Sequence, residues 1–291
     1  MKYEKIIKAK FIERENRFVA RVELSDGEIA KAHVKNTGRC RELLLPGAEV
    51  YLEDHAGHMG SRKLRYSLIA VRKAVTAEGG GRDLRSVLIN MDSQAPNKVV
   101  GEALADGRIR LPGLAAGAHQ KNAMGQKDAA DRLRIKPETR FGDSRFDFYV
   151  EATGQEECPA LTDSSASKEN PSSPASDVRK AFIEVKGVTL EDGGHARFPD
   201  APTQRGVKHI HELIRAREEG YGAYIIFVVQ MEEVTDVSPN YETHPQFGEA
   251  LAKAEEAGVK ILAYNCLVEP DRLEVKEPID FICKSPAKRI N

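Results

Sequence analysis

The chain has 291 residues, of which 41% are hydrophobic and 31% charged, and its formal net charge at pH 7 is −1. This length allows two domains with real cores, and this composition is typical of a folded globular protein and not of a disordered one. The longest apolar run, Tyr224 to Val229, is far shorter than the roughly 20 residues of a membrane-spanning helix, and the N-terminus lacks the apolar core of a secretory signal. We therefore expect a cytoplasmic protein.

The first 80 residues predict a small β-barrel domain. Apolar and polar residues alternate over short runs, and the turn Ser25-Asp26-Gly27-Glu28 separates two of them as in a β-hairpin. The expected strands are residues 6–13, 17–24, 29–34, 49–53 and 63–71. Five strands are the number found in an oligonucleotide-binding (OB) barrel.

Charge is distributed unevenly along the chain. Residues 1–80 carry 16 Lys/Arg against 11 Asp/Glu, a balance of +5, which leaves −6 for the remainder. Within the basic part, Arg62, Lys63 and Arg65 stand beside Tyr66, a mixture that can follow a phosphate backbone while an aromatic ring stacks on a base. We expect these three cations to bind nucleic acid; the alternative is a solvated strand face whose charges prevent edge-to-edge association.

The triplet Asn36-Thr37-Gly38 follows the third expected strand and has two interpretations. Its amides and hydroxyl can bind a phosphate, or the triplet can be a tight turn that needs Gly38 at positive φ.

Glycines at 79–81 mark a linker, and a second domain is expected over residues 84–291. It would begin with a buried strand at 87–90, followed by a helix that Asn97 caps and that carries Glu102. Residues 115–130 and 155–177 look like insertions, and the Ser/Pro/acidic composition of the second predicts disorder.

Two strand-like runs of this second domain carry the chemistry. Asp147 stands on the first, and Glu184 and Lys186 stand on the second. Two carboxylates provide hard oxygen ligands for Mg²⁺ or Mn²⁺, and a neighbouring ammonium can orient a water or offset charge on a phosphate, so the trio points to phosphodiester cleavage. The alternative is an ion-pair network at a sheet end.

The tripeptide Glu-x-Lys recurs as Glu274-Val275-Lys276, so it arises by chance. Context separates the two copies. Residues 181–185 read as a mostly buried strand, whereas residues 273–276 alternate like an edge strand. Only Glu184 is expected to be buried.

Alternating helix and strand follow. A helix is expected to open at Pro202 or Thr203, with Arg205 and Lys208 on one face near its start, where they can bind a phosphate or simply be solvated. His209 on this helix is a general base or, more simply, a hydrogen-bonded structural histidine. The remaining expected elements are a strand at 224–229, a helix at 246–257 and a strand at 259–264, which give an α/β fold with a mixed sheet flanked by helices.

Several ordered motifs extend a resemblance over nearly the whole chain. They are Ala32-His33-x-x-Asn36-Thr37-Gly38, Pro96-Asn97 ahead of Glu102-Ala103, Ser144-Arg145-x-Asp147, Glu184-Val185-Lys186-x-Val188-Thr189-Leu190 and Phe198-Pro199-Asp200 with Arg205-Gly206-x-Lys208-His209. Together they resemble the sugar fermentation stimulation protein (SfsA) family. The resemblance implies an N-terminal OB-like barrel, a C-terminal domain similar to the PD-(D/E)XK nucleases, and DNA as the partner. It also implies that an acidic residue of the first helix, here Glu102, joins the Asp147 and Glu184 metal site.

Three functions are therefore in competition. They are a metal-dependent nuclease, a non-catalytic DNA-binding regulator of sugar metabolism genes, and a phosphate- or sugar-phosphate-binding protein. A fold of this kind does not decide between them.

Overall fold

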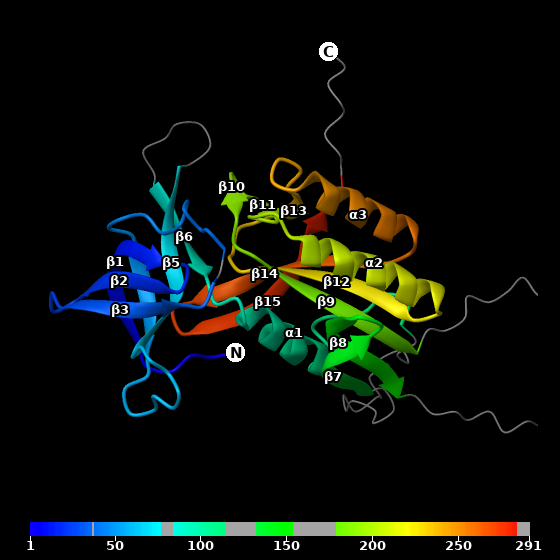
Figure 1. Ribbon diagram of the computed structural model, residues 1–291, viewed down its shortest axis with the longest axis horizontal. Coiled ribbons are helices and arrows are strands. Elements are labelled where there is room, and N and C mark those ends of the chain that lie inside the picture. Colours follow the sequence, from blue (N-terminus) through cyan, green and yellow to red (C-terminus); the bar gives the residue numbers. More distant parts are fainter. Residues whose placement is uncertain (37, 77–83, 115–131, 154–178, 284–291) are drawn as a thin grey trace, which may run out of the picture.

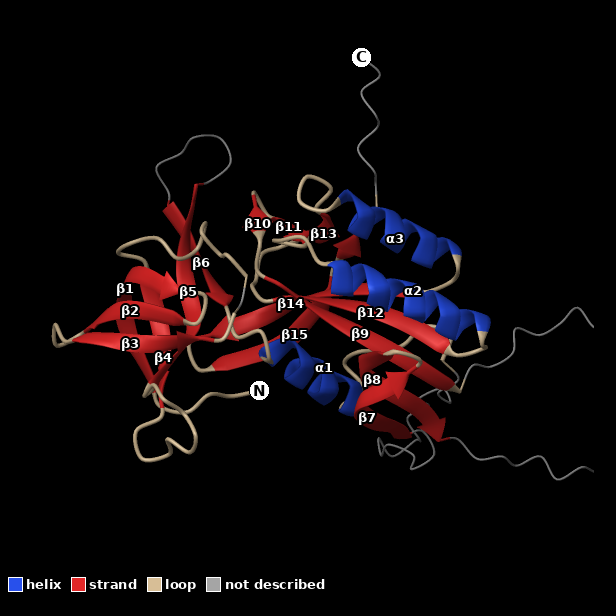
Figure 2. Cartoon of the chain, in the orientation of Figure 1, coloured by secondary structure: helices blue, strands red, loops and turns tan. Residues whose placement is uncertain are grey.

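A computed structural model describes residues 1–36, 38–76, 84–114, 132–153 and 179–283. A β-barrel and an α/β domain stand side by side (Figure 1), and the three helices all belong to the α/β domain (Figure 2). The expected linker and both expected insertions, at 115–130 and 155–177, lie outside the described residues. No helix of the described ranges is long and apolar enough to cross a membrane.

The barrel is built from five strands whose alternating burial matches the sequence pattern. In the second and third strands every other residue is buried, because successive side chains point to opposite faces of a strand. The parallel pairing of β3 with β5 closes the sheet, so that the strands run β1-β2-β3-β5-β4 and return to β1. The strands are β1 (Ile6–Asn16), β2 (Val19–Leu24), β3 (Ile29–Val34), β4 (Glu49–Asp54) and β5 (Tyr66–Thr76). The predicted OB-like barrel is confirmed.

The strand after the linker joins the barrel and not the second domain. β6 (Leu84–Asn90) pairs antiparallel with β5, from Ala70 opposite Asn90 to Thr76 opposite Leu84. We expected residues 84–90 to open the α/β domain, and the structure places that boundary after β6 instead. The reason is that β5 is long enough to extend past the barrel and offers β6 a free edge.

The C-terminal domain is a mixed six-stranded sheet with helices on both faces. Its strands follow the order β15-β14-β12-β9-β8-β7, in which β9, β12 and β14 are parallel to one another. The buried residues of α2 and α3 pack in the core on one face, and those of α1 pack in the core on the other. All eight residues of β12 are buried, as a strand covered on both faces requires. The predicted mixed sheet flanked by helices is confirmed.

The bounds of these elements are α1 (Ala95–Ala105), β7 (Arg132–Phe141), β8 (Ser144–Thr153), β9 (Lys180–Val188), α2 (Gln204–Glu218), β12 (Gly222–Val229), α3 (Pro245–Glu256), β14 (Lys260–Glu269) and β15 (Arg272–Pro278). A small four-stranded sheet beside them contains β10 (Glu191–Asp192), β11 (His195–Phe198), β13 (Asp236–Pro239) and β16 (Asp280–Phe281).

Two helix starts matter for the site. α2 begins where the sequence predicts, because the Thr203 hydroxyl accepts a hydrogen bond from the Gly206 amide and caps the first turn. The expectation that Asn97 caps α1 is wrong. That helix begins at Ala95, with Pro96 in its first turn, where the missing N–H of proline has no partner to lose. Asn97 is thereby left with its side chain free for another role.

Buried polar contacts fix the barrel to the C-terminal domain. Lys73 on β5 forms an ion pair of 2.7 Å with Glu191, whose carboxylate is almost fully buried. Lys35 forms one of 2.9 Å with the buried Asp92. The Gln230 side chain, just after β12, donates to Asn90 at the end of β6. Because these groups are desolvated, breaking any of the contacts would leave a buried polar group unpaired.

Candidate functional site

Adjacent strands bring Asp147, Glu184 and Lys186 together. The antiparallel register of β8 and β9 ends with Phe148 opposite Ile183, which places Asp147 and Glu184 one step further along, opposite each other. The Lys186 ammonium lies 2.6 Å from Glu184 Oε1. The arrangement predicted from the sequence is thus present in space.

Where β8 and β9 separate, the Asp147 side chain takes the place of a backbone hydrogen-bond acceptor. Its Oδ2 accepts the Val185 amide at 2.7 Å, and its Oδ1 accepts the Asn97 side-chain amide at 2.7 Å. Burial raises the pKa of the Asp147 carboxyl above its ordinary value, and the nearby charge of Glu184 raises it further. The two hydrogen bonds fix the orientation of a carboxylate that its surroundings otherwise disfavour.

Glu184 is buried and bound on one oxygen only. Its Oε1 accepts from both the Lys186 ammonium and His209 Nδ1, the latter at 2.5 Å. Its Oε2 is buried and has no hydrogen-bond partner among the described residues. Burial by itself would raise the pKa of Glu184, but the hydrogen bond from His209 and the charge of Lys186 hold that pKa below its ordinary value. The carboxylate is therefore ionised and presents one free oxygen.

His209 lies on α2, which packs against the sheet that contains β9. Its Nδ1 contacts Glu184, and its Nε2 accepts a long hydrogen bond of 3.4 Å from Arg205. Sequence reasoning left His209 open between a base and a structural role; the contact shows that it orients Glu184. Arg205 is exposed at the start of α2 next to this group, and Lys208 is exposed one turn further along.

The remaining predicted site residues lie elsewhere. Glu102 of α1 is half exposed and pairs with the N-terminal ammonium of Met1 at 2.8 Å, and among the described residues no hydrogen bond or ion pair joins it to Asp147 or Glu184. On the barrel, Arg62 and Lys63 are exposed, whereas Arg65 forms a two-pronged ion pair with Asp54, with both N···O distances 2.7 Å. Their roles in metal and nucleic-acid binding stay predictions.

Two contacts in this site were not predicted. Asn97 holds Asp147, and His209 holds Glu184, across 50 and 25 positions of sequence. The Pro96-Asn97 pair and the Lys208-His209 pair both belong to the motifs on which the family resemblance rests, which is the signal that marked them.

Gly38 lies in a bend, and a glycine is needed there for a reason other than positive φ. The Asn36 side chain accepts the Gly38 amide at 2.8 Å, and Gly38 is absent from the glycines with positive φ. A Cβ at Gly38 would lie 2.2 Å from an Asp200 carboxylate oxygen, so any side chain there would force Asp200 to move.

Comparison with known proteins decides the family. The model of the sugar fermentation stimulation protein RE domain matches residues 163–272, and that of the SfsA N-terminal OB domain matches residues 12–78. A sugar fermentation stimulation protein homolog of Clostridium beijerinckii is 44% identical over 97% of this chain and 100% of its own length. The chain belongs to the sugar fermentation stimulation protein family. A homolog of Desulfitobacterium hafniense is likewise 44% identical, over 94% of this chain and 95% of its own.

A solved SfsA structure has the same architecture. SfsA of Pyrococcus furiosus, in complex with Ca²⁺, is 26% identical and superimposes with a TM-score of 0.69 over 97% of this chain and 98% of that one. The OB domain and the mixed sheet are thus features that this SfsA-family chain shares with a known structure.

Proposed function

We propose that this SfsA-family protein binds DNA and hydrolyses its phosphodiester bonds at Asp147, Glu184 and Lys186 with the help of Mg²⁺ or Mn²⁺. The observation that supports this most is the Glu184 carboxylate, which stands opposite Asp147 in the strand register, is buried and ionised, and has no partner for Oε2 among the described residues. A purely structural ion pair would satisfy both oxygens, because an unpaired buried acceptor costs about 1–3 kcal/mol.

The donor set fits a hard divalent cation. Among the described residues there is no cluster of three or more His, Cys, Asp or Glu side chains suited to a metal, so this site offers two carboxylates. Mg²⁺ commonly binds through one or two carboxylates and keeps several waters, which two ligands allow. Asp147 and Glu184 would hold the ion, and its bound state would supply Lewis acidity toward a phosphodiester. The Pyrococcus relative was solved in complex with Ca²⁺, which supports the binding of a divalent cation by this family.

The protein groups have distinct roles in this proposal. Asn97 and the Val185 amide orient Asp147, and His209 orients Glu184 from the opposite side. Lys186 is mostly buried beside Glu184 and would offset negative charge on the phosphate during cleavage. Exposed Arg205 and Lys208 would bind the flanking backbone. In the cytoplasm, where the sequence predicts the protein, DNA is accessible.

A second candidate is DNA binding without cleavage, as in a regulator of sugar metabolism genes. It is favoured by the pairing of Glu184 with Lys186 and His209, which already neutralises the carboxylate without a metal. Both candidate functions include DNA binding, and only the first includes cleavage.

The test uses labelled single- and double-stranded DNA in Mg²⁺, Mn²⁺ and EDTA, scored for both binding and cleavage. We expect metal-dependent cleavage that Asp147→Asn, Glu184→Gln and Lys186→Gln abolish. The second Glu-x-Lys copy provides a matched control, since Glu274 and Lys276 lie on the edge strand β15 and pair with other side chains. Glu274→Gln should cleave like the unmodified protein. DNA binding without cleavage under every metal condition would favour the regulator, and cleavage that survives in Glu184→Gln would refute this site.

A further inference from the structure

Seven of the 16 Lys and Arg side chains in residues 1–80 pair with neighbouring carboxylates in the part of the chain that the structure describes. Lys8 and Arg72 pair with Glu49, and Arg65 pairs with Asp54. Arg21, Lys31, Lys35 and Lys73 have acidic partners as well. A cation that is paired with a carboxylate attracts a phosphate only weakly. The unpaired cations of the barrel are therefore better placed to bind nucleic acid.

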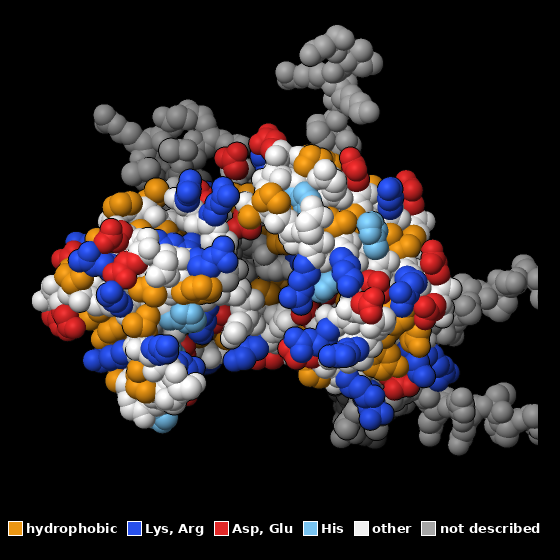
Figure 3. All heavy atoms as spheres, viewed as in Figure 1, with side chains coloured by type: hydrophobic (Ala, Val, Ile, Leu, Met, Phe, Trp, Pro, Cys, Tyr) orange, Lys and Arg blue, Asp and Glu red, His pale blue; other side chains and the backbone are white. Residues whose placement is uncertain are grey.

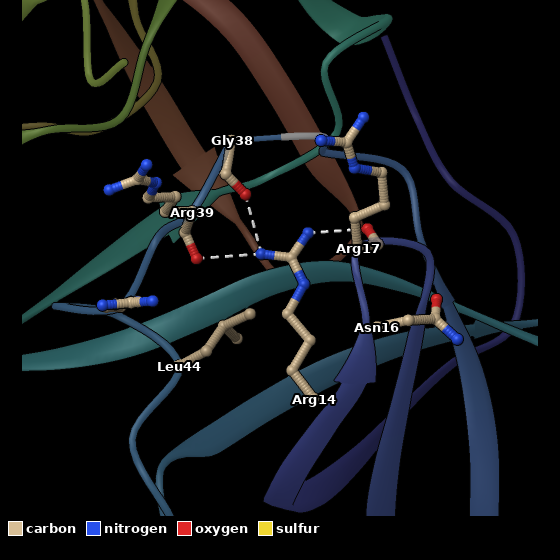
Figure 4. Close-up of a pocket in the computed structure, with 7 residues that line it drawn as sticks. Arg14, Asn16, Arg17, Gly38, Arg39 and Leu44 are labelled. Carbon is tan, nitrogen blue, oxygen red and sulfur yellow. Dashed lines mark hydrogen bonds between the residues drawn. The ribbon is translucent and has the colours of Figure 1, made fainter.

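Three cations without a carboxylate partner among the described residues meet in one hollow of about 310 Å³. Arg17, Arg39 and Arg41 are exposed and line it together with Arg14, Asn16, Gly38 and Leu44 (Figure 4). Three exposed guanidinium groups around one hollow, with no acidic residue in the described lining, make a site for a multiply charged anion.

Arg14 builds the hollow and is not available to a ligand. Its guanidinium donates to the backbone carbonyls of Arg17, Asn36, Gly38 and Arg39, at distances from 2.7 to 2.9 Å. These bonds join the β1–β2 turn to the segment after β3, as the dashed lines of Figure 4 show in part. Arg14 thus fixes the backbone from which the neighbouring Arg17 and Arg39 side chains extend.

An exposed aromatic ring stands next to the hollow. Phe18 is 49% exposed, and the Arg17 guanidinium lies 6.0 Å from its ring centroid. Exposed aromatic rings beside a basic groove are the arrangement that binds single-stranded nucleic acid, because a free base stacks on the ring while the cations follow the backbone. A duplex keeps its bases stacked internally and cannot use Phe18 in this way.

A second hollow adjoins the first and reaches the strand of the proposed active site. The two hollows share Gly38, and the second is lined in addition by Gly187, Arg197, Asp200 and Gln230. Gly187 directly follows Lys186 on β9. Lys and Arg side chains gather on both domains where they face each other (Figure 3).

We propose that Arg17, Arg39, Arg41 and Phe18 bind the backbone and a base of a single-stranded DNA segment whose continuation crosses the domain junction to Asp147 and Glu184. The statement that the DNA continues to Asp147 and Glu184 rests on the proposed function. The statement that the arginine hollow binds single-stranded DNA does not.

The experiment measures binding of a labelled 20-nucleotide single strand by fluorescence anisotropy in EDTA, where no metal-dependent cleavage occurs. Arg17→Gln/Arg39→Gln/Arg41→Gln should weaken binding at least tenfold, and the slope of log Kd against log salt should fall by ~2, since each phosphate contact on a single strand contributes ~0.7. Phe18→Ala should weaken binding without changing that slope. The control Arg62→Gln/Lys63→Gln/Arg65→Gln removes the same charge from the same domain and should have a clearly smaller effect.

Equal losses of affinity in the two triple variants, or unchanged affinity in the arginine-hollow variant, would overturn the proposal. So would a duplex whose binding depends on these arginines to the same degree. Displacement of the single strand by inorganic phosphate at low millimolar concentration would also overturn it, because the hollow would then be a site for the free anion. Cleavage assays of the same variants in Mn²⁺ separate the two proposals. If neither the unmodified protein nor any variant cleaves DNA, but binding of the single strand still depends on the three arginines, the nuclease proposal fails and the single-strand proposal stands.

Discussion

The two carboxylates of the site should respond differently to neutralisation when no metal is present: Glu184→Gln should destabilise the protein, and Asp147→Asn should change its stability little. The pKa of Glu184 lies below its ordinary value, so its surroundings favour the charge, whereas the pKa of Asp147 lies above its ordinary value, so its surroundings oppose it. Glu184→Gln leaves the Lys186 ammonium and His209 without an anionic acceptor. Hydrogen bonds to charged groups contribute roughly 1.5–3 kcal/mol each, of which a neutral amide oxygen keeps a part, so we expect a loss of about 2 kcal/mol.

Asp147→Asn removes a disfavoured charge and one of two accepted hydrogen bonds, because an amide NH₂ cannot accept. The lost bond costs about 1 kcal/mol, and relief of the buried charge offsets it, so stability should stay within about 1 kcal/mol of the unmodified protein. For a protein of this size about 2 kcal/mol corresponds to a fall in Tm of ~4–8 °C. Thermal unfolding in EDTA at pH 7 should therefore show a clear loss for Glu184→Gln and little change for Asp147→Asn.

Acidification should remove the stability difference between the unmodified protein and Glu184→Gln. The stabilisation from Glu184 is complete above its ordinary pKa of 4.5 and is lost as the pH falls through its lower folded-state pKa, so the gap between the unmodified protein and Glu184→Gln should close in acid. The cost of the Asp147 charge is present above its raised folded-state pKa and vanishes below the ordinary 3.8. Equal destabilisation by the two variants at pH 7, or a gap for Glu184→Gln that widens in acid, would refute this account of the site.

Further outcomes follow from the same contacts. Mn²⁺ at 100 times its Kd should stabilise the unmodified protein by about 2.7 kcal/mol in thermal unfolding, and both carboxylate variants should lose this effect while Lys186→Gln keeps it but no longer cleaves DNA. Thr203→Ala should cost about 1 kcal/mol in urea unfolding, because it removes the cap of the helix that carries His209. Gly38→Ala should cost about 1–3 kcal/mol by forcing Asp200 away, whereas Gly101→Ala, whose Cβ would meet only the Phe148 ring at 3.4 Å, should be neutral or stabilising by up to about 1 kcal/mol.

The sequence predicted the barrel well because its information is local. Alternation along residues 19–24 and 29–34 and the turn between them determine a hairpin without reference to the rest of the chain. The place of β6 was mispredicted, since a buried strand reads the same whichever sheet it joins. Only the pairing with β5 assigns it to the barrel.

The same limit applies to the site. Asp147, Glu184 and Lys186 could be named from their residue types and strand context, but their partners could not. Asn97 looked like a helix cap, because Asn before an apolar periodic run is the usual cap signal. The helix instead begins three residues earlier, with Gln94 as its N-cap and Pro96 in its first turn. The unpaired arginines of the barrel were also hidden, because a sequence does not show which cations have carboxylate neighbours. Arg65 looked available and is paired, whereas Arg17, Arg39 and Arg41 are separate in sequence and meet at one hollow.

The separation of β8 from β9 explains why a buried, like-charged pair persists at this point. Beyond Phe148 the ladder ends, and the Val185 amide would be left unpaired in the interior unless a side chain accepted it. Asp147 Oδ2 is that acceptor, so the fold itself requires an oxygen here, and an Asn side chain would fill the same structural need without the charge. The negative charge of Asp147 is therefore not needed for folding. This carboxylate, whose ionisation the protein interior opposes, is held by two donors and stands opposite Glu184 in the strand register, and this arrangement fits the cation that we propose to bind here.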